Sequence, residues 1–108
     1  MACALVTGAT GGIGSELCDI LAGNGYDLVL VARNEEKLIA LSKRLELAYG
    51  VEAPAFPADL SKPGIADLLF RAVIEEGIVV DILANNAGFG DQGAFLDSDW
   101  ERQEKMID

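Results

Sequence analysis

The sequence of 108 residues contains no histidine and only two cysteines, and both shortages limit its chemistry. Without histidine, a Ser-His-Asp triad cannot form within the chain. Cys3 and Cys18 lack the Cys-x-x-Cys spacing that is typical of zinc sites and redox motifs. We therefore expect no metal site in this chain, and a reducing, cytoplasmic setting.

Positive charge and long apolar segments are also scarce. The sequence has 8 basic and 18 acidic residues, and the resulting net charge of −10 argues against a nucleic-acid partner. Gly, Asp or Asn interrupts the apolar stretches, which excludes a membrane-spanning helix of about 20 apolar residues. Residues 1–7 lack the basic start of a signal peptide. Hydrophobic residues still make up 51% of the chain, so we expect one domain with a packed core.

Short apolar runs predict four strands, over residues 2–7, 27–32, 51–58 and 80–84. The second run is almost entirely apolar, as expected for a strand with helices on both faces of its sheet. Pro54 and Pro57 favour a sheet edge for the third segment, because proline cannot donate a hydrogen bond to a neighbouring strand.

Apolar residues at helical spacing fill the intervals between these strands. The predicted helix boundaries are marked by Ile13 and Gly23-Asn24-Gly25, by Asn34 and Gly50, by Ser61-x-Pro63 and Gly77, and, for a last helix, by the capping box Ser98-x-x-Glu101. The residues expected on the buried faces are Ile13, Leu17 and Leu21, then Leu38, Leu41, Leu45 and Ala48, then Ile65, Leu68, Leu69, Ala72 and Val73.

This alternation predicts an α/β fold with a doubly wound parallel sheet, the Rossmann fold, because parallel strands need right-handed helical crossovers. We expect the strand order 3-2-1-4, with the chain ending after the start of its fourth helix. In such sheets, ligands bind beside the carboxyl end of the first strand.

A glycine-rich segment, Thr7-Gly8-Ala9-Thr10-Gly11-Gly12-Ile13-Gly14, joins the first strand to the first helix. A diphosphate needs close backbone, unpaired N–H groups and a positive helix terminus, and this position supplies all three. No Gly-Lys-Ser/Thr follows, so the segment is not a P-loop. The alternative is a glycine-rich turn without a ligand.

Two motifs together resemble the short-chain dehydrogenase/reductase family: Thr7-Gly8-x-x-x-Gly12-Ile13-Gly14 and Asn85-Asn86-Ala87-Gly88. Asp59-Leu60, after the third predicted strand, is similar to the position that contacts adenine in that family. The glycines also fit Gly8-x-x-Gly11-x-x-Gly14, the spacing of the epimerase-like branch, whereas Asn-Asn-Ala-Gly favours the dehydrogenases. The resemblance implies an oxidoreductase that interconverts a small-molecule carbonyl and an alcohol by hydride transfer with a nicotinamide cofactor.

The resemblance also implies a set of cofactor-binding residues. Asp59 would contact the adenine amino group, and Thr10 and Ile13 would contact the phosphates and the nicotinamide side. The full set is Gly8, Thr10, Gly12, Ile13, Gly14, Arg33, Asp59, Leu60, Asn85, Asn86, Ala87 and Gly88.

Arg33, directly after the second predicted strand, favours NADP(H) over NAD(H). A carboxylate at this point binds the ribose hydroxyls of NAD, whereas a guanidinium pairs with a 2′-phosphate. The alternative is a solvated Arg33, with Glu35 or Glu36 reaching the ribose.

The family's catalytic Tyr-x-x-x-Lys is absent from this sequence. We therefore interpret residues 1–108 as the NAD(P)-binding domain, the cofactor half of a longer reductase, inactive alone and a homo-oligomer at full length. The rival hypotheses are a non-catalytic dinucleotide-binding or redox-sensing module and a structural adaptor with an empty glycine loop.

Overall fold

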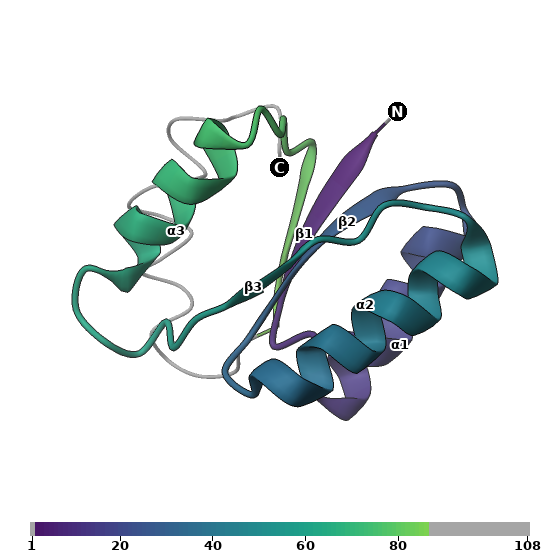
Figure 1. Cartoon of the computed structure of the whole chain (residues 1–108), viewed down its shortest axis with the longest axis horizontal. Helices are drawn as coiled ribbons and strands as arrows, with labels where there is room; N and C mark the ends of the chain where they lie inside the picture. Colours follow the sequence, from purple (N-terminus) through teal and green to yellow (C-terminus); the bar gives the residue numbers. More distant parts are fainter. Residues whose placement is uncertain (1, 87–108) are drawn as a thin grey trace.

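Four parallel strands form one sheet in the order β3-β2-β1-β4 (Figure 1), as predicted. The computed structural model describes residues 2–86, so the helix predicted from Ser98 lies outside the described residues. The strands are β1 (Cys3–Thr7), β2 (Asp27–Ala32), β3 (Ala55–Pro57) and β4 (Ile82–Asn85). Thr7 pairs in register with Val31 on one side and with Asn85 on the other, so these strands end at a common edge.

Three helices cover the two faces of the sheet. The helices α1 (Gly12–Gly23) and α2 (Glu35–Tyr49) lie on one face, and α3 (Ile65–Glu75) lies on the other (Figure 1). Each face has its own apolar core, and β1 and β2 contribute alternate side chains to both. This two-sided burial explains the continuous apolar runs of the two central strands.

The boundaries of α2 follow from its sequence. Asn34 caps the helix, since its side chain accepts a hydrogen bond of 3.0 Å from the backbone N–H of Lys37. Glu35 and Glu36 occupy the first turn, where the helix dipole favours acidic residues. Gly50 ends the helix in the left-handed conformation with φ of 70°, as predicted.

The buried face of α1 is centred one position away from the predicted one. Gly14, Cys18 and Ala22 are buried, whereas Leu17 is half-buried, Leu21 packs half-buried against the core, and Ile13 is 67% exposed. Both sets of residues are spaced by four, so periodicity cannot separate them. The smaller set lies inside because α1 begins very close to the end of β1, where a large side chain would not fit.

Smaller differences affect the other elements. The third helix begins at Ile65 rather than at residues 61–63, since Gly64 has φ of 82° and interrupts the helix there. In that helix Leu69 and Val73 are buried, but Leu68 is 60% exposed. Ala48 of α2 is also exposed. Only residues 55–57 of the third predicted extended segment pair as a strand, and they form the sheet edge that the prolines favour.

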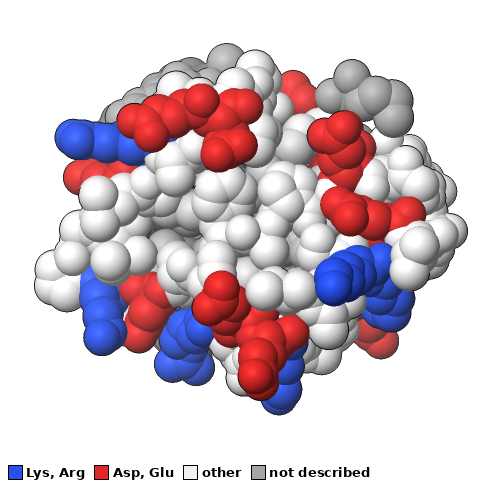
Figure 2. All heavy atoms as spheres, viewed as in Figure 1, with Lys and Arg blue, Asp and Glu red and all other residues white. Residues whose placement is uncertain are grey.

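The described surface carries charges of both signs. On the face shown in Figure 2, acidic and basic side chains surround an uncharged centre between α3 and α2. None of the helices within residues 2–86 combines the length and apolar character needed to cross a membrane.

Candidate functional site

The carboxyl edge of the sheet begins with the glycine loop between β1 and α1. Gly8 has φ of 63°, in the left-handed region that favours glycine. The N–H of Gly11 donates to the Gly8 carbonyl at 3.1 Å and closes the turn. The N–H of Ala9 donates to the Val31 carbonyl of β2 at 3.1 Å, which fixes the loop to the sheet.

The N-terminus of α1 has no side-chain cap. Its N-cap residue is Gly11, no side chain forms a capping hydrogen bond, and the first turn contains no acidic residue. The N–H of Ser15 donates to the Gly11 carbonyl at 2.8 Å, and this is the first hydrogen bond with the four-residue spacing of an α-helix. The preceding amides and the helix dipole therefore form an electropositive end that suits an anion.

The two glycines at the start of α1 have different surroundings. A Cβ atom on Gly14 would lie 2.0 Å from the Gly8 carbonyl oxygen, so only glycine permits this approach of helix and loop. A Cβ atom on Gly12 would meet no heavy atom of the described residues within 4 Å. Packing within residues 2–86 thus requires Gly14 but not Gly12, which borders open space.

Thr7 connects the end of β1 to the end of β4. Its fully buried hydroxyl donates to Asn85 Oδ1 at 2.8 Å and accepts from the backbone N–H of Asn86 at 2.8 Å. The motif alone placed Thr7 at the start of the glycine loop but did not predict that its hydroxyl forms this bridge. A signal was available, since a threonine at the last position of β1 faces the asparagine of the neighbouring strand in register.

Arg33 and Asp59 lie at the carboxyl ends of the neighbouring strands β2 and β3. The N–H of Ala58 donates to the Ala32 carbonyl at 2.9 Å, so the two charged residues follow directly from a paired position. Arg33 is exposed and Asp59 is half-buried. The hydroxyl and backbone N–H of Ser61 lower the pKa of Asp59 by hydrogen bonding, and the nearby positive charge of Arg33 lowers it further.

The structure brings most of the predicted site residues to this one edge of the sheet. Ile13 projects from the first turn of α1, and Thr10 lies half-buried in the glycine loop. Leu60 packs against the core beneath α3. Asn85 ends β4 and Asn86 follows it, while Ala87 and Gly88 lie outside the described residues.

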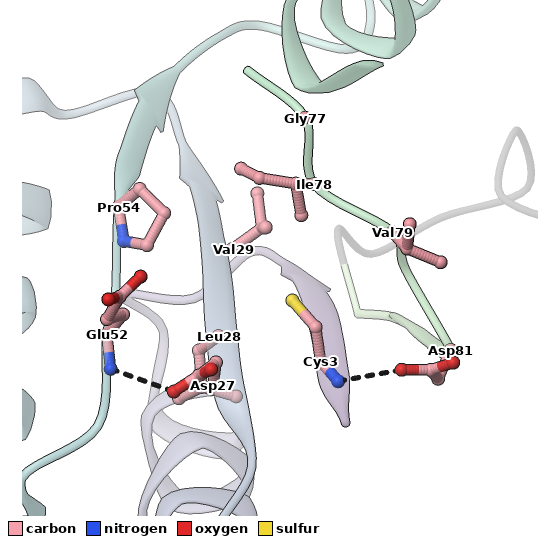
Figure 3. Close-up of a pocket in the computed structure, with 10 residues that line it drawn as sticks. All are labelled: Cys3, Asp27, Leu28, Val29, Glu52, Pro54, Gly77, Ile78, Val79 and Asp81. Atoms are coloured by element: carbon pink, nitrogen blue, oxygen red, sulfur yellow. Dashed lines mark hydrogen bonds between the residues drawn. The ribbon is translucent and has the colours of Figure 1, made fainter. Parts of the chain in front are cut away.

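A hollow of about 450 Å³ lies at the opposite, amino edge of the sheet (Figure 3). Asp81 accepts from the N–H of Cys3 at 2.9 Å, and Asp27 accepts from the N–H of Glu52 at 3.0 Å. Burial, with the Asp27 and Asp81 charges, raises the pKa of the Cys3 thiol to about 11, which makes it a poor nucleophile at neutral pH. The hollow contains none of the predicted site residues, and its Asp27 and Asp81 carboxylates already accept hydrogen bonds from backbone N–H groups.

Known proteins resemble this chain in sequence and in fold. The sequence model of the short chain dehydrogenase family matches residues 2–108, and the chain belongs to that family. A 7beta-hydroxysteroid dehydrogenase from Collinsella aerofaciens is 38% identical over 103 residues, which are 95% of this chain and 38% of the relative.

Two solved structures extend the comparison. A short-chain dehydrogenase from Sphingobium yanoikuyae in complex with NADPH has 39% identity and a TM-score of 0.74, covering 83% of this chain and 35% of that one. An L-sorbose reductase from Gluconobacter frateurii, complexed with NADPH and L-sorbose, has 32% identity and a TM-score of 0.77 over 82% of this chain and 34% of that one. The chain therefore spans well under half the length of these relatives.

Proposed function

We propose that residues 1–108 form the NADP(H)-binding part of a short-chain oxidoreductase that interconverts a small carbonyl compound and an alcohol. The observation that carries this proposal is the uncapped N-terminus of α1, open at Gly12, at the same sheet edge as Arg33. We further propose that the whole protein is a homo-oligomer, as the family resemblance implies.

The diphosphate of the dinucleotide would bind at the start of α1. The first-turn amides donate to phosphate oxygens, and the helix dipole favours their negative charge. At Gly12 the absence of a side chain lets the backbone approach the phosphate, which is consistent with the open space found there. Gly8 and Gly14 act indirectly, because they hold the loop against the helix.

The adenosine half would extend along the ends of β2 and β3. Arg33 would pair with the 2′-phosphate that distinguishes NADP(H) from NAD(H), and Asp59 would accept from the adenine amino group beside Leu60. The exposure of Arg33 supports this role, since its guanidinium can reach a ligand.

The nicotinamide half would extend toward the end of β4. Thr10 and Ile13 would contact it from the glycine loop, and Asn85 and Asn86 from the strand end. Ala87 and Gly88 would leave room for the ribose. The 67% exposure of Ile13 is consistent with this contact, since its side chain is accessible to a ligand.

The cofactor would carry the hydride, and the proton donor must be supplied elsewhere, because the sequence contains no Tyr-x-x-x-Lys. We therefore propose that this chain binds cofactor but is inactive alone. The same absence favours a second candidate, a dinucleotide-binding module without catalysis. A hydride-transfer assay on the longer coding sequence distinguishes these two candidates, since only the oxidoreductase would turn over.

Replacing Arg33 tests the cofactor assignment. We expect Arg33→Ala to weaken NADPH binding by about tenfold or more, because a charge-assisted hydrogen-bonded pair is lost, and to leave NADH binding nearly unchanged. Fluorescence titration of both dinucleotides measures this, with Arg71→Ala as a control at an exposed arginine of α3. A loss of NADPH affinity below twofold relative to NADH would overturn the NADP(H) assignment.

A further inference from the structure

We propose that Ser61 is a positioning residue: it holds the Asp59 carboxylate in the orientation that recognises the adenine amino group. This inference rests on the proposed function and extends it to the choice of base. Ser61 is exposed and lies outside both sequence motifs, and we assign it a role in cofactor specificity.

Two hydrogen bonds from Ser61 fix the Asp59 side chain. The Ser61 hydroxyl donates to Asp59 Oδ1 at 2.6 Å, and the Ser61 backbone N–H donates to the same oxygen at 3.0 Å. The Lys62 N–H donates to the Asp59 carbonyl at 3.2 Å and closes the turn. An aspartate at the edge of a sheet would otherwise exchange between rotamers, so these bonds select one orientation before a ligand arrives.

Both hydrogen bonds from Ser61 end on Asp59 Oδ1, so the two oxygens of the carboxylate have different surroundings. Within residues 2–86, Oδ2 accepts no hydrogen bond and is available to a donor. An ionised carboxylate only accepts hydrogen bonds, so it fits the donor N–H₂ of adenine. A base with a carbonyl oxygen at that position would be repelled.

The surroundings of Asp59 keep it in this accepting form. An aspartate with the ordinary pKa of 3.8 is already ionised at neutral pH, and hydrogen bonds from Ser61 with the charges of Arg33 and Lys62 lower the pKa of Asp59 further. Arg33, the proposed partner of the 2′-phosphate, is thus close enough to act on Asp59. Arg33 and Asp59, at the ends of neighbouring strands, would then contact the 2′-phosphate and the adenine of the same adenosine.

The test compares NADPH with its hypoxanthine analogue, in which a carbonyl oxygen replaces the adenine amino group. Calorimetry on the whole chain gives the ratio of the two dissociation constants for the wild type and for Ser61→Ala, Ser61→Thr and Asp59→Asn. Ser42→Ala is the matched control, since it also removes a serine hydroxyl that bonds near β3, in this case to the Ala53 carbonyl.

We expect the wild type to prefer NADPH by about tenfold, the worth of one hydrogen bond to a charged group. Asp59→Asn should lose most of this preference and Ser61→Ala a clear part of it, since the backbone N–H of residue 61 still bonds Oδ1, whereas Ser61→Thr and the Ser42 control should keep it. The threonine variant retains the hydroxyl and therefore separates positioning from general stability.

Three results would overturn the inference. If Ser61→Ala weakens both ligands equally, Ser61 is structural only. If the wild type binds both ligands equally well, Asp59 does not recognise the adenine amino group, although the chain still binds the dinucleotide. If the wild type binds neither ligand, the proposed function fails and the inference fails with it.

Discussion

Thr7 and Asn85, the last residues of β1 and β4, are joined by a hydrogen bond of 2.8 Å between Thr7 Oγ1 and Asn85 Oδ1. The same buried hydroxyl accepts from the N–H of Asn86. One side chain thus aligns the glycine loop, which follows Thr7, with the second sequence motif. The two halves of the proposed cofactor site depend on this connection.

Removing that hydroxyl should destabilise the fold. Thr7→Val preserves shape but removes both hydrogen bonds of the buried Thr7 hydroxyl, at a cost of about 1–3 kcal/mol in the free energy of unfolding. Urea denaturation measures the loss, and Thr7→Ser, which keeps the hydroxyl, should recover part of it. Equal stability of Thr7→Val and the wild type would show that the bridge contributes nothing.

Alanine at Gly12 and at Gly14 should separate binding from folding. Gly14→Ala places a Cβ 2.0 Å from the Gly8 carbonyl oxygen and should cost about 1–3 kcal/mol of stability, as overpacking does. Gly12→Ala meets no described atom and should leave stability unchanged or slightly higher, but should weaken NADPH binding. Only Gly14→Ala should lose stability in urea denaturation, whereas Gly12→Ala should lose NADPH affinity without losing stability; equal stability of the two variants would contradict this distinction.

The ion pair between α1 and α2 should make stability depend on pH in acid. Arg44 bonds Asp19 at 2.9 Å and 3.2 Å, and these bonds, with that from Tyr49, lower the pKa of Asp19 below its ordinary value of 3.8. A lowered folded-state pKa gives a contribution that is complete above the unfolded-state pKa and is lost as pH falls through the folded value.

Asp19→Asn should therefore reduce stability at pH 7 by up to about 1 kcal/mol, since the pair lies at the surface. The difference from the wild type should shrink as pH falls below about 4. Urea denaturation across this range measures it, with Glu16→Gln on the same helix as the control. A difference that stays constant down to pH of about 2 would refute the assigned role.

Both cysteines should react slowly in the native chain. Burial raises the pKa of Cys18 to about 12 and that of Cys3 to about 11, so little thiolate is present at neutral pH. Iodoacetamide labelling followed by mass spectrometry should modify both far more slowly in buffer than in denaturant. Rapid labelling of the native chain would contradict the burial of these thiols.

The sequence predicted the strand order and therefore the sheet edge at which most candidate site residues lie, because apolar runs and helical spacing alternate along the chain. It could not choose between Ile13 and Gly14 as the start of the buried face of α1, since both begin a series spaced by four. That choice depends on the contact between Gly14 and the Gly8 carbonyl, which only the folded loop creates.

The hydrogen bonds among the candidate site residues also could not be predicted from the sequence. The bridge from Thr7 to Asn85 depends on the register of β1 and β4, and the bonds from Ser61 depend on the turn after β3. A side chain's hydrogen-bond partner is set by such local geometry. The residue types of the candidate site were predictable, but the way they hold one another in place was not.

The start of α1 and Arg33 are proposed to bind one phosphorylated dinucleotide together. Isothermal titration calorimetry of residues 1–108 with NADPH and with NADH is the decisive test of this proposal. We predict saturable binding of NADPH at one site per chain, about tenfold or more tighter than binding of NADH. Absence of binding heat with both dinucleotides over a range of temperatures would contradict the claim.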